Sequence, residues 1–206
     1  MKINEVRDAM YQELTPHLPG WKLVKKQQGF VRTIDGGDQR IVIDAVDYRP
    51  EYRVTLTFVT RLDAVEAVFH RATGTPPSQF GFTAATQLVY FFPGESPPKQ
   101  FKVHDRAEIA AAMNALAPVL RERALPLMDR TRTVEELDAA MNGDDRAFDM
   151  SALQPRVMHG LIVAHFARNP RFDDLVRRYQ AEMSAFSDAQ KQCVADLVIE
   201  LTKDPP

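Results

Sequence analysis

The stretch that decides the fold runs from Trp21 to Arg61 and reads WKLVKKQQGFVRTIDGGDQRIVIDAVDYRPEYRVTLTFVTR. It contains successive runs rich in β-branched and aromatic residues, which are typical of strands. The glycines of DGGD (35–38) allow the positive φ of a tight reversal, and DYRP (47–50) marks the next one. From Val54 to Phe58, apolar residues alternate with polar ones, as in a strand with one buried face. We therefore predict an antiparallel meander.

Outward from this meander, residues 3–14 predict an amphipathic helix, because Val6, Met10 and Leu14 lie four residues apart with charged residues between them. On the other side, Thr86 to Phe92 is a dense β-branched and aromatic run, and an alternating segment follows at 101–104. This pattern predicts a second hairpin that extends the same sheet.

The chain after Asp105 reads mainly as helix. The run GLIVAHFA (160–167) is apolar on nearly all sides, which predicts a helix at the centre of a helical layer. Residues 142–149 form a polar, glycine-containing stretch that we interpret as a hinge. Three pairs have the spacing of a helix N-cap and its capping-box partner: Asp63 with Glu66, Asp105 with Glu108, and Thr133 with Glu136.

These elements predict an α+β fold. An antiparallel sheet over residues 21–104 would be covered by the N-terminal helix and by a C-terminal helical layer. We expect residues 1–125 to form a sheet domain and residues 126–206 a helical subdomain packed on it, either as two domains or as a single one.

Composition excludes several classes of function. With 26 basic and 28 acidic residues, the chain lacks the basic field of a nucleic-acid-binding protein. Its single cysteine, Cys193, excludes an intrachain disulfide. The charged N-terminus lacks the apolar segment of a signal peptide, and no apolar run approaches the ~18 residues of a membrane span. We expect a cytoplasmic protein that binds neither nucleic acid nor membrane.

No motif in the sequence predicts a metal, a cofactor or a catalytic site. The phosphate-binding, dinucleotide-binding and nucleophile-elbow patterns are all missing. The five histidines lack metal-ligand spacing, so we expect each to pack with its polar tip satisfied. They lie at positions 17, 70, 104, 159 and 165. We predict no cofactor and no metal, and the sequence speaks against an enzyme without excluding one.

Polar side chains gather on the adjacent strands and turn of the meander: Arg32, Arg40, Asp44, Asp47, Tyr48, Arg49, Glu51, Tyr52 and Arg53. Cross-strand ion pairs on the wet face of the sheet would explain most of them, with Asp44 opposite Arg32 or Arg53. A catalytic carboxylate pair is an alternative. Tyrosine and arginine are enriched at interface hot spots, so the turn is our candidate recognition surface. Its binding residues would be Tyr48, Arg49, Glu51, Tyr52 and Arg53.

The segment TGTPPSQFGFTA (73–84) has too much proline and glycine for regular structure, yet it carries Phe80 and Phe82. Loop phenylalanines usually anchor the loop under its own sheet. The alternative is a partner-binding loop, and both residues join the candidate binding set.

A second, acidic cluster comprises Asp138, Asp144, Asp145 and Asp149. It is either a patch for a basic partner or a set of solvated helix ends and loop residues.

Three segments, Gly29–Arg32, Ile41–Ile43 and Val54–Phe58 followed by Arg61–Asp63, give residues 1–125 a resemblance to a group of small bacterial proteins of unknown function. In that group an N-terminal helix precedes a Gly-Phe strand start and a meander. Proteins that look like this often serve as cognate immunity proteins of bacterial toxin systems. The resemblance therefore implies a binding role, and it carries over no catalytic residue.

Our leading hypothesis is a bacterial, cytoplasmic protein that binds another protein, namely an immunity protein that neutralises a toxin domain by covering it. One alternative is a small-molecule-binding protein or enzyme with a pocket between sheet and helices, using Asp44, Asp47 and His104. A second alternative is a scaffold or oligomerisation module that uses the last two helices. The sequence leaves the oligomeric state open.

Overall fold

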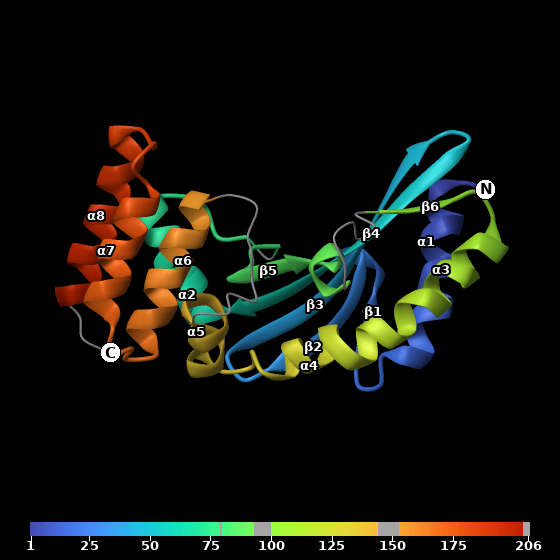
Figure 1. Cartoon of the computed structure of the whole chain (residues 1–206), viewed down its shortest axis with the longest axis horizontal. Helices are drawn as coiled ribbons and strands as arrows, with labels where there is room; N and C mark the ends of the chain where they lie inside the picture. Colours follow the sequence, from blue (N-terminus) through green and yellow to red (C-terminus); the bar gives the residue numbers. More distant parts are fainter. Residues whose placement is uncertain (79, 93–99, 144–152, 204–206) are drawn as a thin grey trace. The chain divides into compact units, whose positions relative to one another are not determined.

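A computed structural model describes residues 1–78, 80–92, 100–143 and 153–203 (Figure 1). It confirms the α+β class, with an antiparallel sheet, an N-terminal helix and a set of C-terminal helices. None of the helices in these ranges is both long and apolar enough to cross a bilayer.

The meander predicted from residues 21–61 is present. The strands are β1 (Lys22–Val24), β2 (Gly29–Ile34), β3 (Gly37–Tyr48), β4 (Glu51–Leu62), β5 (Ala84–Gln87) and β6 (Phe101–Val103). Their order in the sheet is β1-β2-β3-β4-β5, and β6 also pairs with β4. The β4–β6 pair is antiparallel, with Tyr52 opposite Val103 and Arg53 opposite Lys102.

The second predicted hairpin is wrong, although both of its strand regions join the same sheet, as predicted. Only residues up to Gln87 continue as strand, and Leu88–Phe91 form a 3-10 turn. Instead of pairing with each other, β5 and β6 both lie beside β4. Strand β4 has twelve residues, so β6 can pair with its first residues and β5 with another part of it. Local strand propensity does not reveal which strand will serve as the partner.

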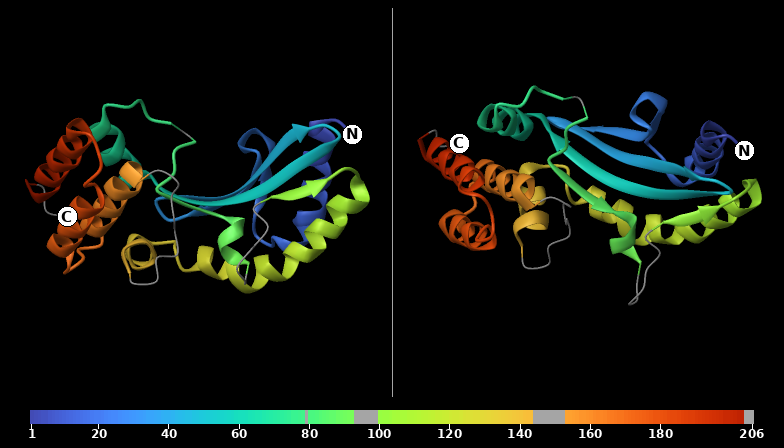
Figure 2. Two further views of the ribbon diagram at one scale, coloured as in Figure 1. Left: turned by 45° about the horizontal axis from the view of Figure 1, so that its top comes forward. Right: turned by 90° about the horizontal axis from the view of Figure 1, so that it is seen from above.

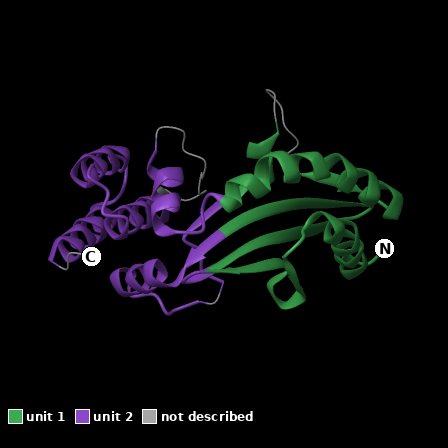
Figure 3. Cartoon of the chain, turned by 90° about the horizontal axis from the view of Figure 1, so that it is seen from below, with its two compact units in different colours: residues 1–34, 38–59, 86–129 green, residues 35–37, 60–85, 130–206 purple. Residues whose placement is uncertain are grey.

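The chain contains two compact units that alternate along the sequence (Figure 3). Unit 1 comprises residues 1–34, 38–59 and 86–129, and unit 2 comprises residues 35–37, 60–85 and 130–206. Strands β3, β4 and β5 therefore each contribute residues to both units. Whether residues 1–125 and 126–206 fold independently as two domains stays a prediction.

In unit 1, one face of the sheet carries the core. Ile41, Ile43, Leu56 and Phe58 are fully buried, whereas the alternate positions of β3 and β4 between them stay half-exposed.

Helix α1 (Ile3–Leu14) packs against α3 (Arg106–Val119), which runs along the sheet in Figure 2. The wider π-type turn η4 (Leu120–Ala124) joins α3 to α4 (Leu125–Asp129). Short 3-10 turns are η1 (Thr15–His17), η2 (Lys25–Gln27) and η3 (Leu88–Phe91).

Unit 2 is mainly helical. Its helices are α2 (Asp63–Thr73), α5 (Val134–Asn142), α6 (Leu153–Phe166), α7 (Phe172–Glu182) and α8 (Asp188–Lys203). Helix α6 contacts the other four, and Val157, Leu161 and Ile162 are fully buried, so the predicted central helix is confirmed. Gly160 permits the close approach of α7, because a Cβ there would lie 2.5 Å from the Tyr179 hydroxyl oxygen.

Two of the three predicted helix caps are confirmed. The Asp105 side chain accepts a hydrogen bond from the Glu108 amide, and Thr133 with Glu136 forms a capping box. The third is wrong, since α2 begins after Leu62 without a side-chain cap. Glu66 instead turns into the interior of unit 2.

Candidate functional site

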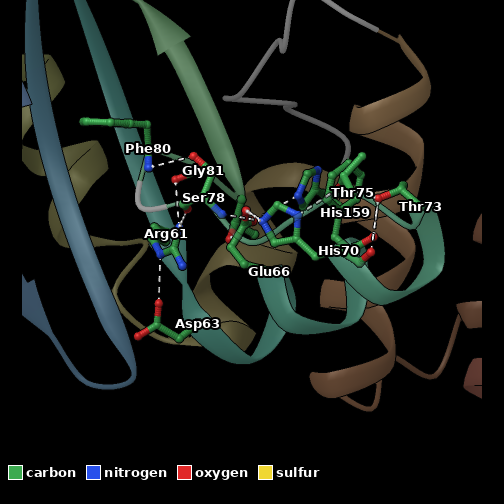
Figure 4. A network of polar contacts seen from close by, with 12 residues as sticks. Arg61, Asp63, Glu66, His70, Thr73, Thr75, Ser78, Phe80, Gly81 and His159 are labelled. Carbon is green, nitrogen blue, oxygen red and sulfur yellow. Dashed lines mark hydrogen bonds and ion pairs between the residues drawn. The ribbon is translucent and has the colours of Figure 1, made fainter.

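Glu66 is the centre of a buried polar network in unit 2 (Figure 4). The residue is only 2% exposed. Its Oε1 accepts a hydrogen bond from the Thr83 hydroxyl at 3.0 Å and lies 3.0 Å from His159 Nε2. Its Oε2 lies 3.9 Å from His70 Nε2. A buried carboxylate is strongly unfavourable unless it is paired and hydrogen-bonded, so these partners are what allow Glu66 to stay inside.

His159, on α6, is the principal partner of Glu66. Its Nδ1 lies 2.8 Å from the Pro155 carbonyl oxygen, which can only accept, so Nδ1 carries a proton. Its Nε2 faces the carboxylate. The ring of Phe69 stacks on the imidazole with centroids 4.1 Å apart. His159 thus packs with both ring nitrogens satisfied, as predicted.

The ionisation of Glu66 follows from these contacts. Burial raises its pKa, but the hydrogen bonds from His159 and Thr83, with the charges of His159 and Arg61, outweigh burial and lower the pKa below its ordinary 4.5. The contacts with His159 and Thr83 thus hold Glu66 in its ionised form inside unit 2.

The network holds the loop of residues 74–83 from inside, apart from residue 79, which is outside the described residues. At its end, the Leu62 amide donates to the Thr83 hydroxyl at 2.9 Å, and the Thr83 amide donates to the Thr60 carbonyl at 3.0 Å. In its middle, Arg61 Nη1 donates to the Ser78 carbonyl at 2.6 Å. These bonds fix the loop to the end of β4.

His70 fastens the first half of the same loop. Its Nδ1 lies 2.9 Å from the Thr75 hydroxyl, and its Nε2 accepts from the Ser78 amide at 3.4 Å. Gly81 completes the packing, because a Cβ there would lie 2.7 Å from Glu66 Oε2 and 3.2 Å from Arg61 Nη1. A side chain at position 81 would therefore displace the network.

Phe80 and Phe82 are both exposed to solvent. They are 56% and 39% exposed, and Phe80 extends from the loop on the side opposite Glu66 in Figure 4. The expectation that they anchor the loop under the sheet is wrong, because Arg61, His70 and Thr83 hold the loop instead. Their role in partner binding stays a prediction.

The second candidate surface lies in unit 1, at the turn between β3 and β4. Tyr48 is 51% exposed, and the guanidinium of Arg53 lies 4.4 Å from its ring centroid. Arg53 Nε donates to Glu51 Oε1 at 2.8 Å, and Lys102 Nζ lies 3.6 Å from the other carboxylate oxygen. The hydrogen bond from Arg53 is the main cause that lowers the pKa of Glu51. Arg49 is highly exposed beside Asp47, at 3.1 Å.

Tyr52 does not belong to this surface. It is only 4% exposed, and its hydroxyl donates to the Met1 carbonyl oxygen. It shares the phase of Val54, Leu56 and Phe58, all of which face the core. The alternation of buried and exposed positions along β4 therefore places Tyr52 on the core face and excludes it from the binding surface. The prediction was wrong because it relied on residue type alone.

Cross-strand ion pairing occurs between Lys102 on β6 and Glu51 on β4, whereas Arg53 pairs with Glu51 within β4 itself. The two arginines that were predicted to lie opposite Asp44 bond to other groups. Arg32 donates to Gln39 and pairs with Asp129 at 2.8 Å. Arg40 pairs with Asp38, its neighbour two residues away on β3.

Two of the three polar groups proposed for a catalytic pocket, Asp47 and His104, are engaged with near neighbours in the sequence. Asp47 pairs with Arg49, and His104 Nδ1 lies 2.9 Å from Glu108 Oε2. A cavity of about 390 Å³ in unit 2 has other walls. It is lined by Asp35, Gly36, Leu62, Ala64, Val65, Arg132, Thr133, Val134, Glu135 and Phe166.

The predicted acidic patch is divided. Asp138 is buried and accepts hydrogen bonds from Asn142 at 2.7 Å and Asn169 at 2.6 Å, so it is a structural acceptor inside unit 2 rather than a solvated charge. Asp144, Asp145 and Asp149 lie outside the described residues, as does most of the predicted hinge.

Sequence reasoning missed the Glu66 network. The i,i+4 spacing of Glu66 and His70 on one helix was available, but the capping-box pattern gave Glu66 another role. His159 lies 93 residues away in the chain, and no local pattern connects it to Glu66.

No family model, curated protein or solved structure matches the chain. The candidate site therefore rests on its own geometry.

Proposed function

We propose that the protein works by binding another protein, and that the loop carrying Phe80 and Phe82 is its docking element. The observation that carries this proposal is the exposure of two large aromatic side chains on a loop that partly buried polar groups hold in place. A loop fixed before binding loses less conformational entropy on association. Exposed aromatic residues are also frequent hot spots of protein interfaces.

The turn at Tyr48 is a second contact surface in this proposal. Stacking on Arg53 restrains the exposed tyrosine ring, and the Glu51 carboxylate restrains Arg53 in turn. Binding would then require little additional ordering of Tyr48. Arg49, Glu51 and Arg53 provide charged groups around the ring.

The kind of partner is proposed from the sequence resemblance. A bacterial, cytoplasmic immunity protein would bind its cognate toxin domain and cover that domain's active site. Such a role needs exposed recognition residues and no catalytic group of its own, which agrees with the arrangement at both surfaces.

The test is co-purification with the product of the neighbouring gene, followed by a toxicity assay and titration calorimetry. We expect a complex that removes toxicity, and we expect replacement of both Phe80 and Phe82 by alanine to weaken it at least about 100-fold, as for a pair of hot-spot residues. Ile199→Ala is the matched control, because Ile199 is another exposed apolar residue of unit 2. A neighbour that is neither toxic nor bound would remove the immunity role, and equal affinity of the Phe80/Phe82 double variant would remove the docking loop.

A small-molecule function is the second candidate, favoured by the cavity of about 390 Å³ in unit 2, a size within the range of ligand pockets. Leu62 and Val65 give it an apolar floor, and Asp35 and Glu135 place carboxylates among its lining. A small aromatic amine such as benzylamine is a suitable probe. Amide shifts confined to the cavity and abolished by Ala64→Trp would support this function, and shifts that survive the substitution would exclude it.

A further inference from the structure

The hydrogen bonds around His70 have a single consistent direction. The Thr73 hydroxyl donates to the Phe69 carbonyl at 2.8 Å, so the Thr75 hydroxyl donates to Thr73 across 2.7 Å. Thr75 then accepts from His70 Nδ1 at 2.9 Å. At the other ring nitrogen, the Ser78 amide can only donate, which leaves Nε2 as the acceptor at 3.4 Å. His70 is therefore held as the neutral Nδ1–H tautomer.

The Glu66 carboxylate is placed to compete for the same nitrogen. Its Oε2 lies 3.9 Å from His70 Nε2, just beyond hydrogen-bond length. The hydrogen bonds from Thr83 and His159 both go to Oε1. Oε2 is therefore the carboxylate oxygen that a proton on His70 Nε2 would meet.

Other charged groups near His70 belong to three elements. From the end of β4, Arg61 is directed at the Ser78 and Gly81 carbonyls and pairs with Asp63. From α6, His159 is bonded to Glu66. From α8, which packs on α2, Glu200 pairs with Arg71 at 2.7 Å. Glu66 is accordingly the carboxylate in closest reach of a protonated His70.

We propose that protonation of His70 releases the Ser78 amide, loosens residues 74–78 and 80–83, and thereby weakens docking through Phe80 and Phe82. This inference rests on the proposed function and adds its regulation. A protonated Nε2 cannot accept from Ser78, so two N–H groups would oppose each other across 3.4 Å. The new N–H instead turns to Glu66 Oε2, where it forms a charge-assisted bond. The loop loses one of its internal attachments while the bond from Arg61 to the Ser78 carbonyl remains, so Phe80, two residues after Ser78, is held less firmly.

The direction is definite: the partner binds tightly when His70 is neutral and less tightly as the pH falls. Because the Ser78 bond is long, a modest effect is expected, roughly fivefold in the opening of the loop.

The test uses nuclear magnetic resonance on the full chain. Long-range ¹⁵N–¹H correlations of the His70 ring report its tautomer and its titration, and hydrogen exchange reports the protection of the Ser78 amide. We expect the Nδ1–H tautomer at high pH and a roughly fivefold loss of Ser78 protection, after correction for intrinsic exchange, with the same midpoint as the His70 titration. An Nε2–H tautomer, or Ser78 protection that stays constant through the titration, would overturn the proposal.

Variants separate the effect of His70 protonation from the docking function. In His70→Gln, a side-chain carbonyl that does not titrate can accept from Ser78, so the pH dependence should disappear. His104→Gln is the control, since His104 is exposed in unit 1 and bonded to Glu108. If His70→Gln does not fold, the wild-type titration decides alone. If partner binding depends on Phe80 but not on pH, the proposed role of His70 protonation is removed and the docking loop stands. If Ser78 protection follows the His70 titration but Phe80→Ala leaves binding unchanged, the docking loop is removed instead.

Discussion

Glu66 and His159 lie 93 residues apart in the chain, yet Oε1 of one and Nε2 of the other are 3.0 Å apart in the interior of unit 2. The contact joins α2 to α6, the central helix of the unit. It connects the helical interior to the loop that presents Phe80 and Phe82, because Glu66 also accepts a hydrogen bond from Thr83 at the end of that loop.

Removing one member of this pair should destabilise the protein strongly. His159→Ala leaves the Glu66 carboxylate buried without its main partner, so we expect a loss of about 3 kcal/mol in the free energy of unfolding, measured by urea denaturation. Arg71→Ala is the control, because its pair with Glu200 is largely exposed and should contribute less than about 1 kcal/mol. A loss for His159→Ala no larger than for the control would contradict the buried contact of Glu66 with His159.

The stability contribution of Glu66 should depend on pH in the acid range. Because the pKa of Glu66 is lowered on folding, its contribution is present above the ordinary value of 4.5 and is lost as the pH falls through the lower value of the folded state. We expect the stability difference between the wild type and Glu66→Gln to shrink from about pH 5 downwards, measured by urea denaturation at each pH. A difference that grows in acid would show that the pKa of Glu66 is raised instead.

Tyr48 and Tyr52 should separate binding from stability. Tyr52→Ala removes a buried aromatic ring, so a loss of about 3 kcal/mol in unfolding free energy is expected. Tyr48→Ala alters an exposed ring, so stability should change by less than about 0.5 kcal/mol while partner affinity falls. Thermal unfolding and calorimetry distinguish the two effects. Unchanged affinity with intact stability for Tyr48→Ala would eliminate this surface from the binding site.

Gly160→Ala tests the packing of α6 against α7. In an exposed helix this change stabilises by about 1 kcal/mol through helix propensity. Here the new Cβ would lie 2.5 Å from the Tyr179 hydroxyl, which is fixed by its hydrogen bond to Asn142. We expect a net loss of about 2 kcal/mol, measured by chemical denaturation, because overpacking outweighs propensity. A stabilised variant would show that α7 can move away at little cost.

The parts of the fold that the sequence predicts correctly depend on local pattern. The alternation of Val54, Leu56 and Phe58 identified the long strand β4, and Asp105 and Thr133 identified two helix starts, because strand phase and capping are decided by residues close in the chain. The prediction of a second hairpin was wrong because strand-forming residues do not specify which strand they pair with.

The candidate site was predictable only in part. The sequence singled out Tyr48, Arg49, Glu51 and Arg53, and it singled out Phe80 and Phe82, which tertiary structure places in solvent. It gave Glu66 the role of a cap, since Asp63 and Glu66 have the right spacing for one.

The sequence by itself determined the class of the fold, the course of the meander and the central helix, since periodicity and turn chemistry act over a few residues. Only the tertiary structure decided that Glu66 faces inward, that His159 meets it and that the loop of Phe80 is held from within. The physical reason is that a carboxylate at a helix start can either cap the helix or be buried. The choice depends on whether distant residues supply enough hydrogen bonds to offset the loss of water.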